Sequence, residues 1–280
     1  MKSLAILSQK GGVGKTSIAV NIACFLAKTG KNVMLLDCDF RGPSMMTFFK
    51  PKVKWLNEYL FNKNINMDYE EYLQDFSLDL NLPGKLLIGF ADPSAKAIDF
   101  VIRITNTDAL IMLRKLLALR RELRENPKYK VDYFIIDSSP GTGFETVNAI
   151  LATDNSLFLI KLSNADIIGT SNMIGGLYEN LKARSLVLAN QVPGSAIKDE
   201  DKKAEIQKLI EDIFAKSIGE KVVEFLGWIP TDYTFQSIEF DEAVKVLRGE
   251  ESARTIFTLK NPEHEFSKIL TEIIPSLFGT

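Results

Sequence analysis

The sequence predicts a single α/β domain, residues 1–280, with a doubly wound, mostly parallel sheet that carries helices on both faces. Three observations predict this fold. Short apolar runs alternate with helical patterns along the whole chain, as in parallel strands joined by crossover helices. Each run is uniformly apolar, which is typical of strands buried on both faces. No repeat or low-complexity tract marks a linker between two domains.

The positions of these runs give the expected order of elements. Gly30 and Pro127 follow the first two helical patterns and are suitable stop signals. The expected strands cover residues 4–7, 33–36, 86–88, 133–136, 157–160, 186–188 and 222–226. The expected helices cover residues 15–29, 108–125, 165–182, 201–217, 238–248 and 262–278.

Residues 44–82 depart from this alternation and are expected to form an irregular helical excursion within the domain, with short helices at 55–60 and 69–76. Aromatic and methionine side chains crowd the excursion. One interpretation, which is favoured, is a locally packed small core. The other is an exposed surface that binds a partner through adaptable apolar side chains. The residues concerned are Met45, Met46, Phe48, Phe49, Trp55, Tyr59, Phe61, Met67, Tyr69, Tyr72 and Phe76.

The composition excludes several classes of protein. The chain is 46% hydrophobic and 25% charged, which is typical of a globular protein with a full core and excludes disorder. Its net charge of -2 argues against a protein that binds nucleic acid over its whole surface. Only two cysteines and one histidine, His264, occur, which excludes a disulfide framework and a His-based nucleophilic triad. No signal peptide or membrane-spanning run is recognisable, so we expect a cytoplasmic protein that begins at Met1.

A glycine-rich loop, QKGGVGKTS at 9–17, follows the first expected strand and carries the strongest functional signal. Glycines let the backbone curl so that N–H groups point at phosphate oxygens, and the next helix adds its unpaired N–H groups and positive dipole end. Lys15 is placed to reach the outer phosphates and the Thr16 hydroxyl to bind Mg²⁺. The loop therefore predicts a P-loop NTPase whose phosphate-binding residues are Gly11, Gly12, Val13, Gly14, Lys15, Thr16 and Ser17.

The loop departs from the common Walker A pattern at its start, where Gln9 stands in place of glycine and Lys10 follows. It resembles the deviant Walker A motif, Lys-Gly-Gly-x-Gly-Lys-Ser/Thr, of the MinD/ParA superfamily of P-loop ATPases. The resemblance implies a homodimer in the ATP state, in which Lys10 reaches the phosphates bound by the other subunit. A second cation there is reasonable because phosphoryl transfer depends on charge stabilisation and positioning. A solvated loop lysine is the disfavoured alternative.

Acidic residues follow two of the expected strands, at the edge where open α/β sheets bind ligands. Asp37 and Asp39 follow the second strand and Asp137 follows the fourth. The family resemblance implies that Asp39 activates the attacking water and contacts the Mg²⁺ shell. It also implies that Asp137 is the Walker B carboxylate, which acts on Mg²⁺ through water. Lys10, Lys15 and Asp39 are thus the expected catalytic residues, whereas Asp37 either caps a loop or pairs with Lys15.

Two later segments resemble the parts of the family that surround the adenine base. Asn190 ends a strand where the family places an asparagine that reads the adenine edge. Gln191 stands where a guanine-reading motif has lysine, so ATP is favoured over GTP. Pro230, Thr231 and Asp232 belong to a segment that resembles the family's Gly-x-Ile-Pro-x-Asp loop, which lies beside the base.

The resemblance covers residues 1–43 and 84–278 and leaves the subfamily open. Relatives that assemble metal centres carry paired cysteines, because soft thiolates cluster around iron or nickel. Cys24 and Cys38 form no Cys-x-x-Cys or Cys-x-Cys motif and are expected to be core residues. A metal carrier is therefore disfavoured, although one cysteine paired with its mate across a dimer stays an alternative.

Membrane and DNA are not the favoured partners. Relatives that bind membranes end in a basic amphipathic helix, whereas the apolar stripe of the last helix here is expected to face the core. A basic cluster on helix 108–125 contains interspersed glutamates, so a solvated face is favoured over a DNA-binding one. The stripe consists of Phe266, Ile269, Leu270, Ile273, Ile274 and Leu277, and the cluster of Arg114, Lys115, Arg120, Arg121 and Arg124.

Taken with the resemblance, the sequence predicts a Mg²⁺-dependent ATPase that converts ATP and water to ADP and phosphate. It would act as a dimerisation switch that controls the positioning or assembly of an unidentified protein partner or cargo. Two alternatives stay open: a metal-centre assembly ATPase, and an ATP-dependent kinase or ligase that acts on a small molecule. The kinase or ligase would need no contribution from Lys10 to a second subunit.

Overall fold

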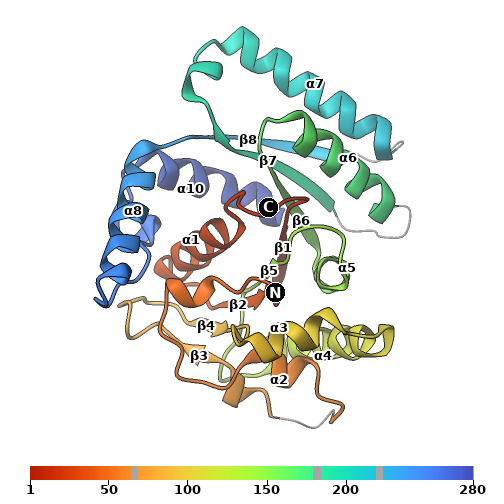
Figure 1. Cartoon of the computed structure of the whole chain (residues 1–280), viewed down its shortest axis with the longest axis vertical. Helices are drawn as coiled ribbons and strands as arrows, with labels where there is room; N and C mark the ends of the chain where they lie inside the picture. The colour runs from red at the N-terminus through yellow and green to blue at the C-terminus, as the bar shows by residue number, and fades with distance from the viewer. Residues whose placement is uncertain (65–67, 179–183, 219–222, 280) are drawn as a thin grey trace.

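The computed structural model describes residues 1–64, 68–178, 184–218 and 223–279 (Figure 1). Three expectations fall partly outside these residues: Met67 of the excursion, residues 179–182 of the expected helix 165–182, and Val222 at the start of the last expected strand. No helix of the described ranges is both long and apolar enough to cross a membrane.

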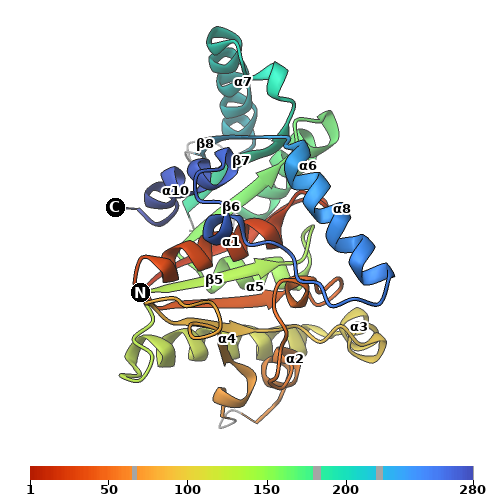
Figure 2. The same cartoon turned by 90° about the vertical axis from the view of Figure 1, so that its left-hand side faces the viewer.

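One sheet runs through the molecule and has eight strands in the described residues (Figures 1 and 2). The strand order is β3-β4-β2-β5-β1-β6-β7-β8, and all neighbours pair in parallel except β3 and β4. This confirms the mostly parallel α/β fold. The strands are β1 (Lys2–Leu7), β2 (Val33–Cys38), β3 (Gln74–Asp75), β4 (Leu86–Gly89), β5 (Tyr133–Ser138), β6 (Asn155–Ile160), β7 (Arg184–Val192) and β8 (Val223–Pro230).

Helices cover both faces of the sheet, and alternate residues of each strand enter different cores. Leu4 and Ile6 of β1 pack with α1 (Lys15–Lys28), α9 (Phe257–Lys260) and α10 (Glu265–Phe278). Ala5 and Leu7 belong to the core on the opposite face. The long helices of that face are α4 (Asn106–Glu125), α6 (Asn164–Tyr178) and α7 (Glu200–Ile218), and the shorter α5 (Phe144–Leu151) and two helices described below also contribute to this core (Figure 1).

Several helices differ from the expected ones. Two eight-residue helices, α3 (Ala95–Ile102) and α5, are not predicted, because two turns are too short to show a clear period. The expected helix 238–248 is α8 (Tyr233–Leu247), which begins earlier because the Asp232 carboxylate caps it. The expected helix 262–278 is α10, which begins after its N-cap His264, and the short helix α9 that precedes it is not predicted.

The excursion at residues 44–82 wraps the edge of the sheet beyond β4 and packs into both cores. Phe49, Phe76 and Phe90 form an aromatic cluster on the α1 side, with the Phe49 and Phe76 ring centroids 4.9 Å apart. Tyr59 and Tyr72 pack on the α4 side. The packed interpretation is thus confirmed for these rings. The excursion contains α2 (Leu56–Leu60) and the 3₁₀ turns η1 (Met45–Thr47) and η2 (Glu70–Tyr72); the expected helix 69–76 is wrong, because β3 follows η2.

Candidate active site

The glycine-rich loop joins β1 to α1 in the geometry that a phosphate cradle needs. Gly12 and Gly14 have φ of 72° and 93°, a region that side chains rarely allow, and Gly14 caps α1 without a side-chain hydrogen bond. A Cβ on Gly14 would lie 2.6 Å from Asn190 Nδ2, so this position also lacks space for a side chain. The first turn of α1 holds no acidic residue, which leaves its N–H groups free for an anion.

A cavity of about 760 Å³ extends from this cradle to the ends of β7 and β8. Most of the predicted site residues line it: Gly11, Gly12, Gly14, Lys15, Thr16, Ser17, Asp39, Asn190, Gln191, Pro230, Thr231 and Asp232. Lys10, Val13 and Asp137 do not line it, and the Val13 side chain is buried in the α1-side core. The cavity therefore brings together segments that lie more than 200 residues apart in the sequence. The volume of the cavity is typical of small-molecule sites.

Asp137 lies behind the cradle, at the end of β5. The Thr16 hydroxyl donates to Asp137 Oδ2 at 2.6 Å, and the Ser44 hydroxyl donates to Thr16 at 3.1 Å. Asp137 Oδ1 is buried and has no hydrogen-bond partner among the described residues. Burial raises the pKa of Asp137 to about 7, against the opposing effects of Lys15 and of the Thr16 hydrogen bond. A hydroxyl beside an orphaned carboxylate oxygen fits the donor set that Mg²⁺ prefers.

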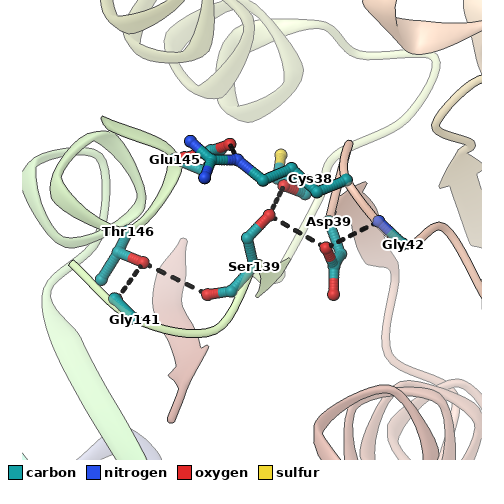
Figure 3. A network of polar contacts seen from close by, with 8 residues as sticks. Cys38, Asp39, Gly42, Ser139, Gly141, Glu145 and Thr146 are labelled. Atoms are coloured by element: carbon teal, nitrogen blue, oxygen red, sulfur yellow. Dashed lines mark hydrogen bonds and ion pairs between the residues drawn. The ribbon is translucent and has the colours of Figure 1, made fainter. Parts of the chain in front are cut away.

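Asp39 lies directly after β2 and lines the same cavity, and Figure 3 shows its polar contacts. Its Oδ1 accepts hydrogen bonds from the Ser139 hydroxyl at 3.0 Å and from the Gly42 N–H at 3.2 Å. Burial raises the pKa of Asp39 and Lys15 opposes that shift. Asp37 Oδ1 accepts from the Asp39 N–H at 3.1 Å, so the loop-capping alternative is the one observed for Asp37.

Two further contacts tie the segment after β5 to its neighbours, one to the Asp39 loop and one to the phosphate loop. Arg41 Nε lies 2.9 Å from Glu145 Oε1, and the Glu145 side chain is completely buried (Figure 3). The Gly141 N–H donates to Ser8 O at 2.9 Å, which links the same segment to the phosphate loop. Arg41, Ser139 and Glu145 are not predicted as site residues, because no local sequence pattern connects partners about one hundred positions apart.

The base-side residues have structural partners of their own. Asn190 Nδ2 donates to Val13 O at 2.8 Å, so this amide braces the phosphate loop. Gln191 takes a left-handed backbone with φ of 58° at the cavity wall. Asp232 caps α8 and lies 2.9 Å from His264 Nε2. Base recognition by Asn190 and by the Pro230 segment stays a prediction.

Lys10 immediately precedes the cavity-lining Gly11 but does not itself line the cavity, and its side chain is 45% exposed. Its Nζ is 3.9 Å from Asp166 of α6, so it is held loosely on its own chain. Gln9 packs against Gly169 of α6, where a Cβ would meet the Gln9 side chain at 3.0 Å. At the two positions where the loop departs from the common pattern, the Gln9 side chain therefore packs against α6, whereas the Lys10 side chain stays accessible to solvent.

The remaining sequence predictions are decided by burial. Cys24 and Cys38 are both completely buried, and burial raises the pKa of each thiol. No group of three or more His, Cys, Asp or Glu side chains in the described ranges is arranged to hold a metal. The last helix faces the core, as expected, through Phe266, Leu270, Ile273, Ile274 and Leu277, with Ile269 partly buried against the same core.

The basic cluster on α4 is a solvated face at Arg114, Arg121 and Arg124, as expected, but not at Lys115. Lys115 is buried, its ammonium donates to Asn64 O, and it lies 4.5 Å from the Tyr59 ring centroid. Arg120 pairs with Asp154, at 2.6 Å between Nη2 and Oδ2. The expectation is wrong at Lys115 because the excursion covers that part of α4 with an aromatic ring and a carbonyl acceptor.

The family model of the AAA domain matches residues 1–185. The chain belongs to this family. Its fold is that of the MinD/ParA superfamily of P-loop ATPases. The chain superimposes on the MinD cell division protein of Aquifex aeolicus with a TM-score of 0.69 and 21% identity over 100% of this chain and 98% of that one. The MinD of Pyrococcus horikoshii, solved in complex with Mg-ADP, gives a TM-score of 0.67 and 18% identity over 99% and 97%.

Relatives of this AAA-domain protein carry different functional names. An iron–sulfur cluster carrier protein of Pyrococcus furiosus is 28% identical over 243 residues, which cover 82% of this chain and 74% of the relative. The sporulation initiation inhibitor protein Soj of Bacillus subtilis is 27% identical over 175 residues, or 62% and 63% of the two chains. Because one fold hosts many functions, these names do not by themselves decide the function of this chain.

Proposed function

We propose that this protein is an ATP-hydrolysing dimerisation switch that controls the positioning or assembly of a protein partner. The observation that carries the proposal is the exposed Lys10, which directly precedes the glycines of a complete phosphate cradle. A cation in that place is available to phosphates bound by a second copy of the chain. The two hydrogen-bonded loops that carry Asp39 and Ser139 supply an element that responds to what the cradle holds.

The chain's own groups account for the hydrolytic step. The loop amides and Lys15 hold the triphosphate, and Lys10 of a second copy adds positive charge on the transferring phosphoryl group. Asp39 accepts a proton from, or orients, the attacking water at the cavity rim. Thr16 and Asp137 would hold Mg²⁺, the latter through water. When bound, Mg²⁺ supplies charge neutralisation along the phosphate chain.

ATP turnover and sedimentation of three proteins test this proposal. Wild type is expected to dimerise with ATP and to hydrolyse it, Asp39→Ala to dimerise and accumulate with ATP, and Lys10→Ala to bind ATP as a monomer with turnover reduced at least tenfold. An Asp39→Ala protein that hydrolyses ATP at the wild-type rate and never dimerises would refute it. The ATP-trapped Asp39→Ala dimer is also the bait for the partner.

A second candidate is an iron–sulfur or other metal-centre carrier, and the relatives named as iron–sulfur cluster carriers or as a cluster assembly factor favour it. The burial of Cys24 and Cys38 opposes it, because a bridging cluster needs thiolates at the surface. Metal analysis and absorption spectra of the protein purified without oxygen separate the two. A stoichiometric, Cys-dependent cluster in the dimer would favour the carrier.

A further inference from the structure

One positively charged side chain that lines the cavity comes from a segment in which the sequence shows no functional motif. Arg254 lies between α8 and α9 and lines the cavity. Its Nη2 donates to Ser17 Oγ at 3.1 Å, and its guanidinium carbon lies 4.6 Å from the Phe48 ring centroid. Ser17 belongs to the first turn of α1, so Arg254 reaches the phosphate cradle from a segment remote in sequence.

The backbone around Arg254 is fixed on both sides. The Arg254 N–H donates to Thr47 O at 2.9 Å, and the neighbouring Thr255 hydroxyl donates to Glu242 at 2.7 Å. Further along, the Thr258 N–H donates to the Asn21 side chain of α1 at 2.9 Å. Because the segment is anchored to α1 and α8, the guanidinium is held within reach of the cavity without a rearrangement of the chain.

The charges around Arg254 indicate that it can bind an anion in the cavity. Its acidic partner is Glu239 of α8, which lines the same cavity. The first turn of α1, which includes Ser17, has no acidic residue. An anion between this turn and Arg254 would therefore meet unpaired N–H groups on one side and a planar guanidinium on the other, a combination that suits phosphate.

The position of Arg254 along the cradle identifies the phosphate. Lys15 and Thr16 serve the outer phosphates and the metal, and Thr16 is bonded to Asp137 at that end. Ser17 is one residue further along α1, and Glu239, the ion-pair partner of Arg254, belongs to α8, which follows the Pro230 segment that is predicted to lie beside the base. We propose that Arg254 binds the phosphate next to the nucleoside, and that Glu239 is its counter-ion when no nucleotide is bound.

This inference rests on the proposed binding of ATP, and two substitutions in the one ion pair test it. Isothermal titration measures the affinity for ADP and for a non-hydrolysable ATP analogue, both with Mg²⁺. Arg254→Gln is expected to weaken both ligands by the same factor, about tenfold or more, because they share the inner phosphate. Glu239→Gln is expected to leave both affinities unchanged or to raise them, because it removes the competitor for the guanidinium.

The controls separate binding from folding. Arg248→Gln removes an exposed arginine at the end of α8 and is expected to leave both affinities unchanged. Unfolding without nucleotide shows whether each variant is folded. Should Arg254→Gln not fold, Arg254→Lys takes its place: it keeps a charge but loses the planar fork, so a fall in both affinities of two- to fivefold is expected.

Two outcomes overturn the inference. One is an unchanged nucleotide affinity in the folded Arg254 variant. The other is a nucleotide affinity that is lower in Glu239→Gln than in wild type, because that result would mean either that the ion pair is purely structural or that Glu239 contacts the nucleotide directly. If wild type binds these ligands in either case, the proposed function stands and only the role of Arg254 falls. If wild type binds neither ligand, both proposals fall.

Discussion

The Ser139 hydroxyl donates to Asp39 Oδ1 at 3.0 Å, which joins the loop after β5 to the loop after β2. The same hydroxyl lies 3.3 Å from Cys38 O, and Ser139 is buried. Its hydrogen bond lowers the pKa of Asp39, in opposition to the effect of burial. Ser139 is therefore placed to keep Asp39 ionised and oriented, and each loop constrains the other.

Replacing Ser139 by Ala is expected to lower ATP turnover at pH 7 about tenfold. Without the hydroxyl, the pKa of Asp39 rises further, so the acid limb of the pH–rate profile moves to higher pH. Turnover measured between pH 5 and pH 9 checks both effects. Ser156→Ala is the control, because the Ser156 hydroxyl is buried in β6 without a partner among the described residues. An unshifted acid limb in Ser139→Ala would rule out this coupling.

Arg41→Ala is expected to destabilise the protein by roughly 1–2 kcal/mol at pH 8, because it leaves the buried Glu145 carboxylate without its partner. The half-exposed Arg41 side chain limits the effect through solvent screening. Burial already raises the pKa of Glu145, and loss of Arg41 raises it further. The destabilisation should therefore shrink as the pH falls and Glu145 takes up a proton. Urea unfolding of Arg41→Ala and of Arg41→Ala/Glu145→Gln measures the loss of unfolding free energy in each variant. An equal loss in both variants would contradict a destabilisation that comes from the unpaired Glu145 carboxylate.

The pKa of Asp137, raised to about 7 by burial, gives the nucleotide-free protein a specific pH dependence. Between about pH 4 and pH 7 the folded chain keeps a proton that the unfolded chain has released. The free energy of unfolding therefore falls as pH rises through this window, by at most about 4 kcal/mol. Asp137→Asn is expected to flatten this part of the stability curve. The exposed Asp79→Asn variant should keep the wild-type curve, and a flattening there would point to a general charge effect.

Gly14→Ala is expected to abolish measurable nucleotide binding and to destabilise the chain by about 1–3 kcal/mol. A Cβ there is strained at φ of 93° and would lie 2.6 Å from Asn190 Nδ2. Nucleotide titration and urea unfolding measure the two effects. Gly194→Ala is the matched control, because nothing lies within 4 Å of a Cβ at that position. Normal binding by Gly14→Ala would show that the loop tolerates a different path.

The sequence predicts the parts of the fold and site that depend on neighbouring residues. Uniformly apolar runs locate the seven parallel strands, because a strand buried on both faces needs apolar side chains at every position. The phosphate loop is predicted because its glycines and the helix start act through local backbone geometry. Asp39 and Asp137 are predicted because the carboxyl ends of parallel strands meet at one edge of the sheet.

Tertiary structure alone decides the contacts between segments that the sheet brings together from far apart in the sequence. Arg254 reaches Ser17, Ser139 reaches Asp39, and Asn190 reaches Val13 only after the strands have taken their order. Lys115 likewise looks like a surface residue by its helical neighbours, yet the excursion buries it. Propensity and hydrophobic period act over a few residues, whereas these pairs depend on strand order, which no local pattern contains.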